Sequence, residues 1–150
     1  MIRLALEKDL DLIIYFINKI AEYEKMSDDV VLDKETLRDY LFNKKIAKCK
    51  FIMEDNKEVG FALYFYNFST FKGKAGLYLE DIFILEEYRH KGYGKKLFLE
   101  LVKEARDYVD IIEIGTPMVI EYGMLAVRTM RENFPEKEIL ADLKIMDGGK

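Results

Sequence analysis

Residues 77–105 constrain the fold of this chain more than any other stretch, because they predict a strand, a glycine turn and a helix in succession. Leu77–Leu85 first alternates and then becomes wholly apolar, which is typical of a buried strand. A charged turn follows and contains Gly92 and Gly94. Beyond it, apolar residues recur at the spacing of one helix face: Leu97, Phe98, Leu101, Val102 and Ala105.

The glycine turn has the properties of an anion site. The first turn of a helix leaves backbone N–H groups unpaired, and the peptide dipoles add partial positive charge there. Gly92 and Gly94 allow close approach of the backbone to a ligand, and four side chains add full charges: Arg89, Lys91, Lys95 and Lys96. Such a turn would hold a phosphate or pyrophosphate. An ordinary strand-to-helix turn with a solvated basic rim is the alternative, and it would be favoured for a lone Gly-x-Gly. The Walker phosphate loop and the dinucleotide fingerprint are both absent.

The six residues Arg89-His90-Lys91-Gly92-Tyr93-Gly94 resemble the Arg/Gln-x-x-Gly-x-Gly/Ala loop of the GCN5-related N-acetyltransferases (GNAT). Three further stretches are similar to the diamine (spermidine/spermine) N-acetyltransferase branch: Ala21–Lys25, Gly60–Tyr64 and Leu77–Phe83. The resemblance covers residues 1–105. It implies an α/β (α+β) fold, with a mixed twisted sheet flanked by helices, and acetyl-coenzyme A as cosubstrate.

The resemblance also implies which residues bind the coenzyme. They lie at the end of the strand and in the glycine turn: Ile82, Phe83, Ile84, Leu85, Arg89, His90, Lys91, Gly92, Tyr93, Gly94 and Lys95. In such a fold, the strands splay near Phe83–Leu85 and free backbone N–H groups. These groups would donate hydrogen bonds to the thioester carbonyl.

Transfer of acetyl to a primary amine by direct attack in a ternary complex is the leading functional hypothesis. An amine arrives protonated, since its reference pKa is about 10, so a base must take its proton. Glu80 is the base that resemblance to the diamine branch implies, and strand alternation places Asp81 on the opposite face. A merely structural role for Glu80 at a sheet edge is the alternative.

An acidic region precedes the sheet. Six carboxylates lie close together in the sequence: Glu22, Glu24, Asp28, Asp29, Asp33 and Glu35. They indicate either a solvated helix end and loop or an electrostatic mouth that attracts a polyamine or lysine-like amine. We expect the small-molecule amine to contact Glu22, Tyr23, Glu24 and Asp81.

The acetyltransferase pattern stops after residue 105, and the chain contains no tryptophan where the family has Asp-Trp-Asn. Instead, Asp107–Pro117 and the segment from Gly123 to Gly149 resemble a fragment of 3-hexulose-6-phosphate synthase, one of the orotidine-monophosphate-decarboxylase-like barrels. Asp142-x-Lys144-x-x-Asp147 matches the catalytic motif of those barrels, and Glu113 matches a carboxylate of their magnesium site. A closed barrel needs about 250 residues, so we expect neither aldolase chemistry nor a metal site here.

The chain therefore reads as a chimera with one acetyltransferase-like domain over residues 1–150, in which 106–150 form a replacement β-α-β segment. We predict a strand at Val109–Ile114 that runs parallel to Leu77–Leu85, a helix over Met118–Asn133, and a strand at Glu138–Leu143. The last strand should pair directly and in parallel with the first of these. Its outer edge would accept a partner's strand, so a homodimer is one allowed assembly.

The replacement also removes the tyrosine that is the family's usual general acid. Tyr122 is the candidate that the new segment offers, although it lies about a turn too early. An inert chimera, or a coenzyme A binder without catalysis, is therefore a rival hypothesis. An aldolase remnant is a remote one.

The remaining segments predict a short strand at residues 2–6, a helix from Leu10 capped by Asp9, and a helix at Lys34–Phe42. A meander follows, with strands at 50–54, 59–67 and 75–85 and a turn at Asp55-Asn56-Lys57.

Composition narrows the setting. The net charge of −4 argues against nucleic acid as the main partner, and no apolar run is long enough for a membrane span. One cysteine and one histidine make a zinc site improbable, and the lone thiol of Cys49 favours a reducing cytoplasm.

Overall fold

The computed structural model describes residues 1–71, 73–107, 109, 111–114 and 124–141. These residues form two compact units, each described by itself below. The first unit contains Met1–Tyr66 and Tyr78–Lys103, and the second contains Asn67–Leu77 and the chain from Glu104. The break at Lys103 lies close to the point where the sequence stops resembling an acetyltransferase. The expectation of one domain over residues 1–150 stays a prediction.

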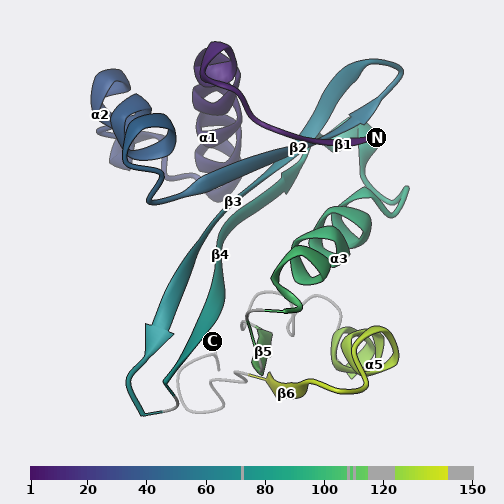
Figure 1. The fold of residues 1–150 in the computed structure, drawn as a ribbon. Helices are drawn as coiled ribbons and strands as arrows, with labels where there is room; N and C mark the ends of the chain where they lie inside the picture. The colour runs from purple at the N-terminus through teal and green to yellow at the C-terminus, as the bar shows by residue number, and fades with distance from the viewer. Residues whose placement is uncertain (72, 108, 110, 115–123, 142–150) are drawn as a thin grey trace. The chain divides into compact units, whose positions relative to one another are not determined.

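The main sheet has the strand order β1-β2-β3-β4 (Figure 1). Its strands are β1 (Ile2–Leu4), β2 (Lys48–Glu54), β3 (Lys57–Ser69) and β4 (Lys74–Ile84). β1 pairs with β2, and β2 with β3, in antiparallel ladders. The β2–β3 turn has Asp55 and Asn56 in the left-handed region, which is the conformation that a two-residue hairpin turn requires. The predicted meander is therefore confirmed.

The helices of the first unit are α1 (Leu10–Glu24), α2 (Lys34–Arg38), which continues as a π-helical turn at Asp39–Asn43, and α3 (Tyr93–Ala105). Asp33 caps α2 by accepting a hydrogen bond from the Thr36 N–H at 2.7 Å. The predicted apolar face of α3 is confirmed, because all five of its members are buried: Leu97, Phe98, Leu101, Val102 and Ala105.

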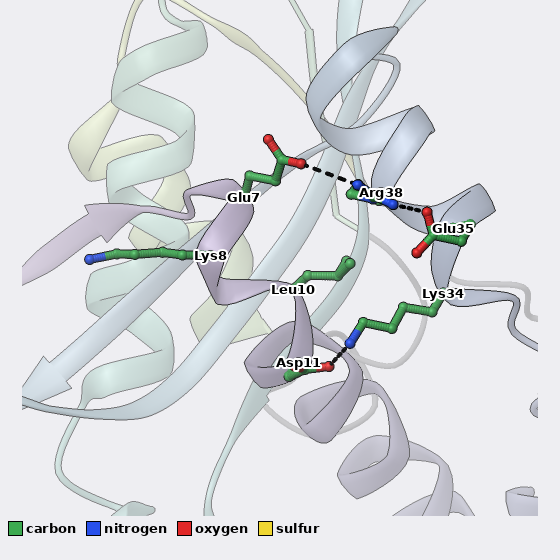
Figure 2. A pocket seen from close by; sticks show the side chains of 7 residues that line it. All are labelled: Glu7, Lys8, Leu10, Asp11, Lys34, Glu35 and Arg38. Atoms are coloured by element: carbon green, nitrogen blue, oxygen red, sulfur yellow. Dashed lines mark hydrogen bonds and ion pairs between the residues drawn. The ribbon is translucent and has the colours of Figure 1, made fainter.

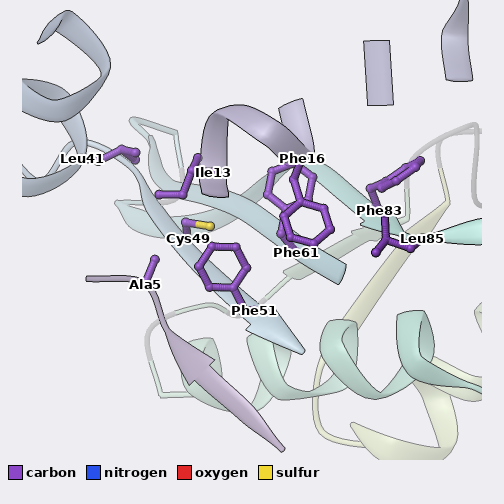
Figure 3. Close-up of a cluster of buried hydrophobic side chains, with 9 residues drawn as sticks. All are labelled: Ala5, Ile13, Phe16, Leu41, Cys49, Phe51, Phe61, Phe83 and Leu85. Atoms are coloured by element: carbon purple, nitrogen blue, oxygen red, sulfur yellow. The ribbon is translucent and has the colours of Figure 1, made fainter. Parts of the chain in front are cut away.

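The core of the first unit lies between α1 and the sheet. Figure 3 shows Phe16 of α1 against Phe51 and Phe61 of the neighbouring strands, with Phe83 and Leu85 beside them. The ring centroids of Phe16 and Phe61 are 5.3 Å apart in a stacked arrangement. Burial of a large apolar side chain contributes about 1.5–3 kcal/mol, so this aromatic cluster is a main source of stability.

The opposite face of the sheet faces α3, as strand alternation requires. Lys50 is the neighbour of Phe51 on β2, and its ammonium lies 3.9 Å from Glu100 of α3. Figure 1 likewise shows α1 and α2 on one side of the strands and α3 on the other. The glycine turn connects the end of β4 to the start of α3.

The second unit contains β5 (Ile111–Ile114), α5 (Met124–Asn133) and β6 (Glu138–Ala141). β5 and β6 pair in parallel from Ile111↔Glu138 to Ile114↔Ala141, so the predicted direct parallel pairing is confirmed over those residues. The expected ladder between β5 and the strand at Leu77–Leu85 is not found in the described part of the chain. There, β5 and β6 form a sheet of their own. The start of the predicted helix at Met118 and the end of the strand at Leu143 lie outside the described residues.

Asp9 has a different role from the predicted cap. Its carboxylate makes no capping bond to α1 and instead accepts two hydrogen bonds from the Arg3 guanidinium, at 2.6 and 3.0 Å, and one from the Leu6 N–H at 2.8 Å. Arg3 also binds Glu58 at 2.7 Å and stacks on Phe51, with its Cζ 4.9 Å from the ring centroid. Asp9 therefore links the start of α1 to Arg3 in β1 of the sheet.

We expect Asp9→Asn to lower the free energy of unfolding by about 1–3 kcal/mol at pH 7, because it leaves the partly buried Arg3 with only one of its two charge partners, Glu58. The hydrogen bonds from Arg3 hold the pKa of Asp9 below its usual 3.8. Its contribution is therefore present above about pH 4 and is lost as the pH falls further. Urea unfolding at pH 7 and pH 3 measures both effects. The matched control is Asp11→Asn, whose exposed pair with Lys34 should contribute little. Equal losses in the two variants would contradict this account.

Candidate functional site

The glycine turn has the conformation of an anion-binding loop. Gly92 has φ of 77°. The backbone N–H of Lys96 donates to the Gly92 carbonyl at 3.0 Å, and this is the first hydrogen bond of α3. The first N–H groups of the helix therefore have no acceptor within it and point out of its start. His90 is also left-handed, with φ of 61°, so two residues of the turn adopt a conformation that L side chains rarely take.

The two glycines are needed for different reasons. A Cβ at Gly92 would meet no atom within 4 Å, so only its left-handed backbone calls for glycine. A Cβ at Gly94 would lie 3.8 Å from Ile84 Cγ1, which is an ordinary contact, and its φ is not positive. Packing within the chain therefore does not explain Gly94, whereas close approach of a ligand would.

The cationic side chains around the turn largely contact other residues of the protein. Arg89 Nε donates to the Ile84 carbonyl at 3.0 Å, and its guanidinium stacks on Tyr23 and Phe83, with Cζ 4.4 and 5.2 Å from the ring centroids. Lys91 pairs with Glu54. His90 and Lys95 are exposed. The coenzyme contacts expected of these residues stay predictions.

The end of β4 differs from the expectation in one respect. The Leu85 N–H is not released by splaying strands, since it donates to the Val59 carbonyl at 2.9 Å. The expectation of a freed N–H was therefore wrong at Leu85, because β3 accompanies β4 to its end. The side chains of Phe83 and Leu85 belong to the core cluster, and Ile82 and Ile84 are half-buried.

An acidic and aromatic group of residues lies where the last turn of α1 meets β4. Asp81 is half-buried, and burial, followed by the nearby charges of Glu80 and Glu24, raises its pKa from 3.8 to about 6. The ring centroids of Tyr23 and Phe83 are 6.2 Å apart. Glu80 is exposed, as alternation with Asp81 requires. Such a carboxylate is a good partner for a cation, because a nearby positive charge offsets both the cost of its burial and the repulsion from the two neighbouring carboxylates.

Fewer of the six acidic residues are available to a substrate than the sequence suggested. Glu22 pairs with Lys19 at 2.6 Å, Asp33 caps α2, and Glu35 pairs with Arg38 within their own helix. These three carboxylates therefore have local structural partners. Glu24 is the one of the six whose charge acts on Asp81.

A polar surface cavity of about 590 Å³ lies between the start of α1 and α2 (Figure 2). Ion pairs cross it, from Lys34 to Asp11 at 2.5 Å and from Arg38 to Glu7 at 3.7 Å. It contains none of the predicted site residues. Charged partners already occupy its walls, so its arrangement is that of a helix-to-helix contact.

Several predicted candidates of the replacement segment fall outside the residues that the structure describes. Tyr122, Asp142, Lys144 and Asp147 lie outside the described residues. Within the described part of the chain, no group of three or more histidine, cysteine, aspartate or glutamate residues is arranged to hold a metal ion. The helices described there include none that is both long and apolar enough to cross a membrane.

Two models of known families match overlapping parts of the chain. A model described as the acetyltransferase (GNAT) family matches residues 16–118. A second, described as the orotidine 5'-phosphate decarboxylase / HUMPS family, matches residues 89–150.

Curated relatives fall into the same two groups. A thialysine N-epsilon-acetyltransferase of Bos taurus is 36% identical over 116 residues, which are 71% of this chain and 68% of that protein. A 3-hexulose-6-phosphate synthase of Bacillus subtilis is 57% identical over 51 residues, which are 34% of this chain. The chain spans only about a quarter of that synthase, 24% of its length.

Solved acetyltransferase structures share the fold. A possible acetyltransferase from Clostridium difficile has a TM-score of 0.56 at 27% identity, over 71% of this chain and 70% of that one. An aminoglycoside acetyltransferase from an uncultured soil sample, in complex with sisomicin, has a TM-score of 0.58 at 18% identity, over 99% of this chain and 80% of that one. The predicted mixed α/β class is therefore confirmed.

Proposed function

Because the chain belongs to the acetyltransferase (GNAT) family, we propose that it transfers acetyl from acetyl-coenzyme A to a small primary amine. The observation that carries this proposal is the glycine turn. Gly92 is left-handed, and Gly94 lacks a side chain for which the protein itself has room. At the start of a helix, a glycine such as Gly94 that neither its backbone conformation nor its packing requires fits the close approach of a pyrophosphate.

The coenzyme would lie along the end of β4 and over the start of α3. The backbone N–H groups from Gly92 to Lys95 would donate to phosphate oxygens. The exposed Lys95 would add positive charge, and the exposed His90 would lie beside the phosphates. Residues Ile82–Leu85 would flank the pantetheine arm. The supporting observation is that Arg89 Nε donates to the Ile84 carbonyl at 3.0 Å, which holds the turn beside the end of the strand.

The amine would bind at the acidic group formed by Glu24, Asp81 and the exposed ring of Tyr23. A half-buried carboxylate with a raised pKa gains most from a cationic partner. Arg89 lies over Tyr23 and begins the glycine turn, so the two sides of the proposed site are adjacent. The bovine relative is named for acetylation of thialysine at its ε nitrogen, and a lysine-like amine or a diamine fits the same chemistry.

Two protons must leave the amine nitrogen, and one proton must be supplied to the departing sulfur. Glu80 is the proposed base: it takes a proton from the ammonium, directly or through water, so that the nitrogen lone pair can attack the thioester carbonyl. A C–N bond then forms and the nitrogen loses its second proton to water. The C–S bond breaks, and the thiolate takes a proton from an acid or from water. Tyr122 is the proposed acid. A thiol is a fair leaving group, so its loss would slow the reaction without abolishing it.

We further propose that residues 106–150 are a barrel fragment that replaces the last part of an acetyltransferase. A strand, a helix and a strand of the same handedness would serve either fold, and the parallel pair β5–β6 supports this. A cytoplasmic location accords with the single, buried and unpaired thiol of Cys49. A homodimer is the proposed assembly if the edge of β6 accepts a partner's strand.

Thiol release from acetyl-coenzyme A in the presence of single amines tests the proposed function. We expect release with a lysine analogue or a diamine, and none with the matching alcohols, because an alcohol carries no positive charge for Asp81. Asp28→Asn is the control variant, since Asp28 is an exposed acid outside the proposed site. Binding of acetyl-coenzyme A without release over any amine would show a coenzyme binder instead.

A further inference from the structure

One carboxylate, that of Glu54, contacts both chain neighbours of Gly92. The Tyr93 hydroxyl donates to Glu54 Oε1. The Lys91 ammonium donates to both oxygens of the same carboxylate, at 3.4 and 3.3 Å. The turn is therefore held on both sides of Gly92 by one carboxylate.

Glu54 is itself held by a rigid element. It is the last residue of β2 and pairs with Lys57 across the tight turn at Asp55 and Asn56. The register shifts by a bulge between Ile52 and Met53, just before it. Bulges re-aim the side chains that follow them, and here the side chain that follows points toward the glycine turn.

The glycine turn needs such a hold. A left-handed conformation is unfavourable for a residue other than glycine, and His90 adopts it directly beside Lys91. A turn of this kind relaxes unless its surroundings fix it. The Glu54 side chain is 26% exposed, so its pair with Lys91 is partly shielded from water.

We propose that Glu54 is a positioning residue for coenzyme binding. It keeps Lys91 and Tyr93 in place, so that the backbone N–H groups around Gly92 are arranged for a phosphate before one arrives. This inference rests on the proposed function and deepens it, because it names what preorganises the same turn. Preorganisation improves affinity by removing an ordering cost from the binding step.

Electrostatics alone makes the opposite prediction, which allows a sharp test. Glu54 is a negative charge beside a proposed phosphate site, and it competes with that phosphate for Lys91. If it did nothing else, its removal would tighten coenzyme binding. If it positions the turn, its removal weakens binding. The sign of the change in KM therefore decides between the two.

We expect Glu54→Ala to raise the KM for acetyl-coenzyme A about fivefold or more, with kcat at saturating coenzyme within twofold of wild type. Tyr93→Phe should have a smaller effect in the same direction, and the double variant should be less affected than the sum, because both changes break one contact. Glu54→Gln keeps the size and the acceptor for Tyr93, so it tests the inference if the alanine variant fails to fold.

The matched control is Asp55→Asn, which removes the same charge one residue away at a left-handed position that asparagine tolerates. It should not raise the KM. Hydrogen exchange over residues 89–96 of the coenzyme-free protein should be faster in Glu54→Ala than in wild type. A KM for Glu54→Ala that is unchanged or lower overturns this inference and leaves the proposed function standing. A wild type that does not bind acetyl-coenzyme A in calorimetry overturns both.

Discussion

Gly92→Val should reduce the affinity for acetyl-coenzyme A by on the order of 100-fold. Gly92 has φ of 77°, which a β-branched residue adopts only with strain. The turn would relax, and the N–H groups that we assign to the pyrophosphate would lose their common direction. Isothermal titration calorimetry with acetyl-coenzyme A measures the loss.

The chain supplies its own control for backbone strain. Gly73 also has a positive φ, of 64°, and a Cβ there would likewise meet nothing within 4 Å. Gly73→Val therefore carries the same kind of local penalty at a position outside the proposed site, and it should bind the coenzyme as wild type does. Equal losses in the two variants would attribute the effect to stability and remove the support for a coenzyme turn.

Two substitutions at Gly94 test whether the ligand lies close to this backbone. Alanine fits the protein at this position, since its Cβ would make only the ordinary contact with Ile84 at 3.8 Å. The related loops carry glycine or alanine there, so Gly94→Ala should keep most of the affinity. Gly94→Val projects further and should lose it. If alanine and valine were equally harmless, the ligand would not approach this backbone.

Glu80→Gln should lower kcat by about 10²–10⁴ while leaving coenzyme binding intact, because an amide cannot take the proton from the amine. The loss should be largest at neutral pH, where the amine still needs deprotonation. Asp81→Asn should act differently and raise the KM for the amine, since the proposed partner of the ammonium is gone. Steady-state kinetics in both substrates, from pH 5 to pH 9, separates the two roles.

The pH profile identifies Asp81 further. Its pKa is raised to about 6, so in wild type kcat/KM for the amine should fall as the pH drops below that value, because the protonated carboxyl no longer attracts a cation. This inflection should be absent from Asp81→Asn. If Asp81→Asn lost kcat as severely as Glu80→Gln, with an unchanged amine KM, Asp81 and not Glu80 would be the base.

Stability should move in the opposite direction to activity at this residue. A folded-state pKa above the unfolded one means that the neutral form favours folding, and this advantage is lost as the pH rises through about 6. Ionised Asp81 therefore destabilises the protein above that pH. Asp81→Asn should resist urea better than wild type at pH 8 and equally at low pH. A substitution that raises stability and lowers activity is expected at a functional residue.

Local patterns were enough to predict the parts of the fold that depend on nearby residues. The apolar spacing along Tyr93–Ala105 predicted the buried face of α3 correctly. The parallel pairing of β5 with β6 also followed from the chain order and the handedness of crossovers.

Contacts between distant segments could not be read in this way. Asp9 looked like a helix cap because aspartate is common there, but Arg3 and the chain geometry give it a better partner. No local pattern marks Glu54 as a contact of the glycine turn, because Lys91 and Tyr93 lie 37 and 39 residues further along the chain. The Leu85 N–H was expected to be free, although β3 is long enough to pair with it. In each case a tertiary contact decided a choice that the local sequence left open.

Mass-spectrometric detection of the N-acetylated amine tests the central claim most directly, because thiol release alone does not separate transfer from hydrolysis. Wild type, acetyl-coenzyme A carrying a labelled acetyl group and a lysine analogue are incubated together, with Glu80→Gln and Gly92→Val in parallel. We expect labelled N-acetyl product from wild type, and far less from either variant at the same enzyme concentration. Thiol release with labelled acetate and no acetylated amine, or product formed equally by all three proteins, would contradict the account.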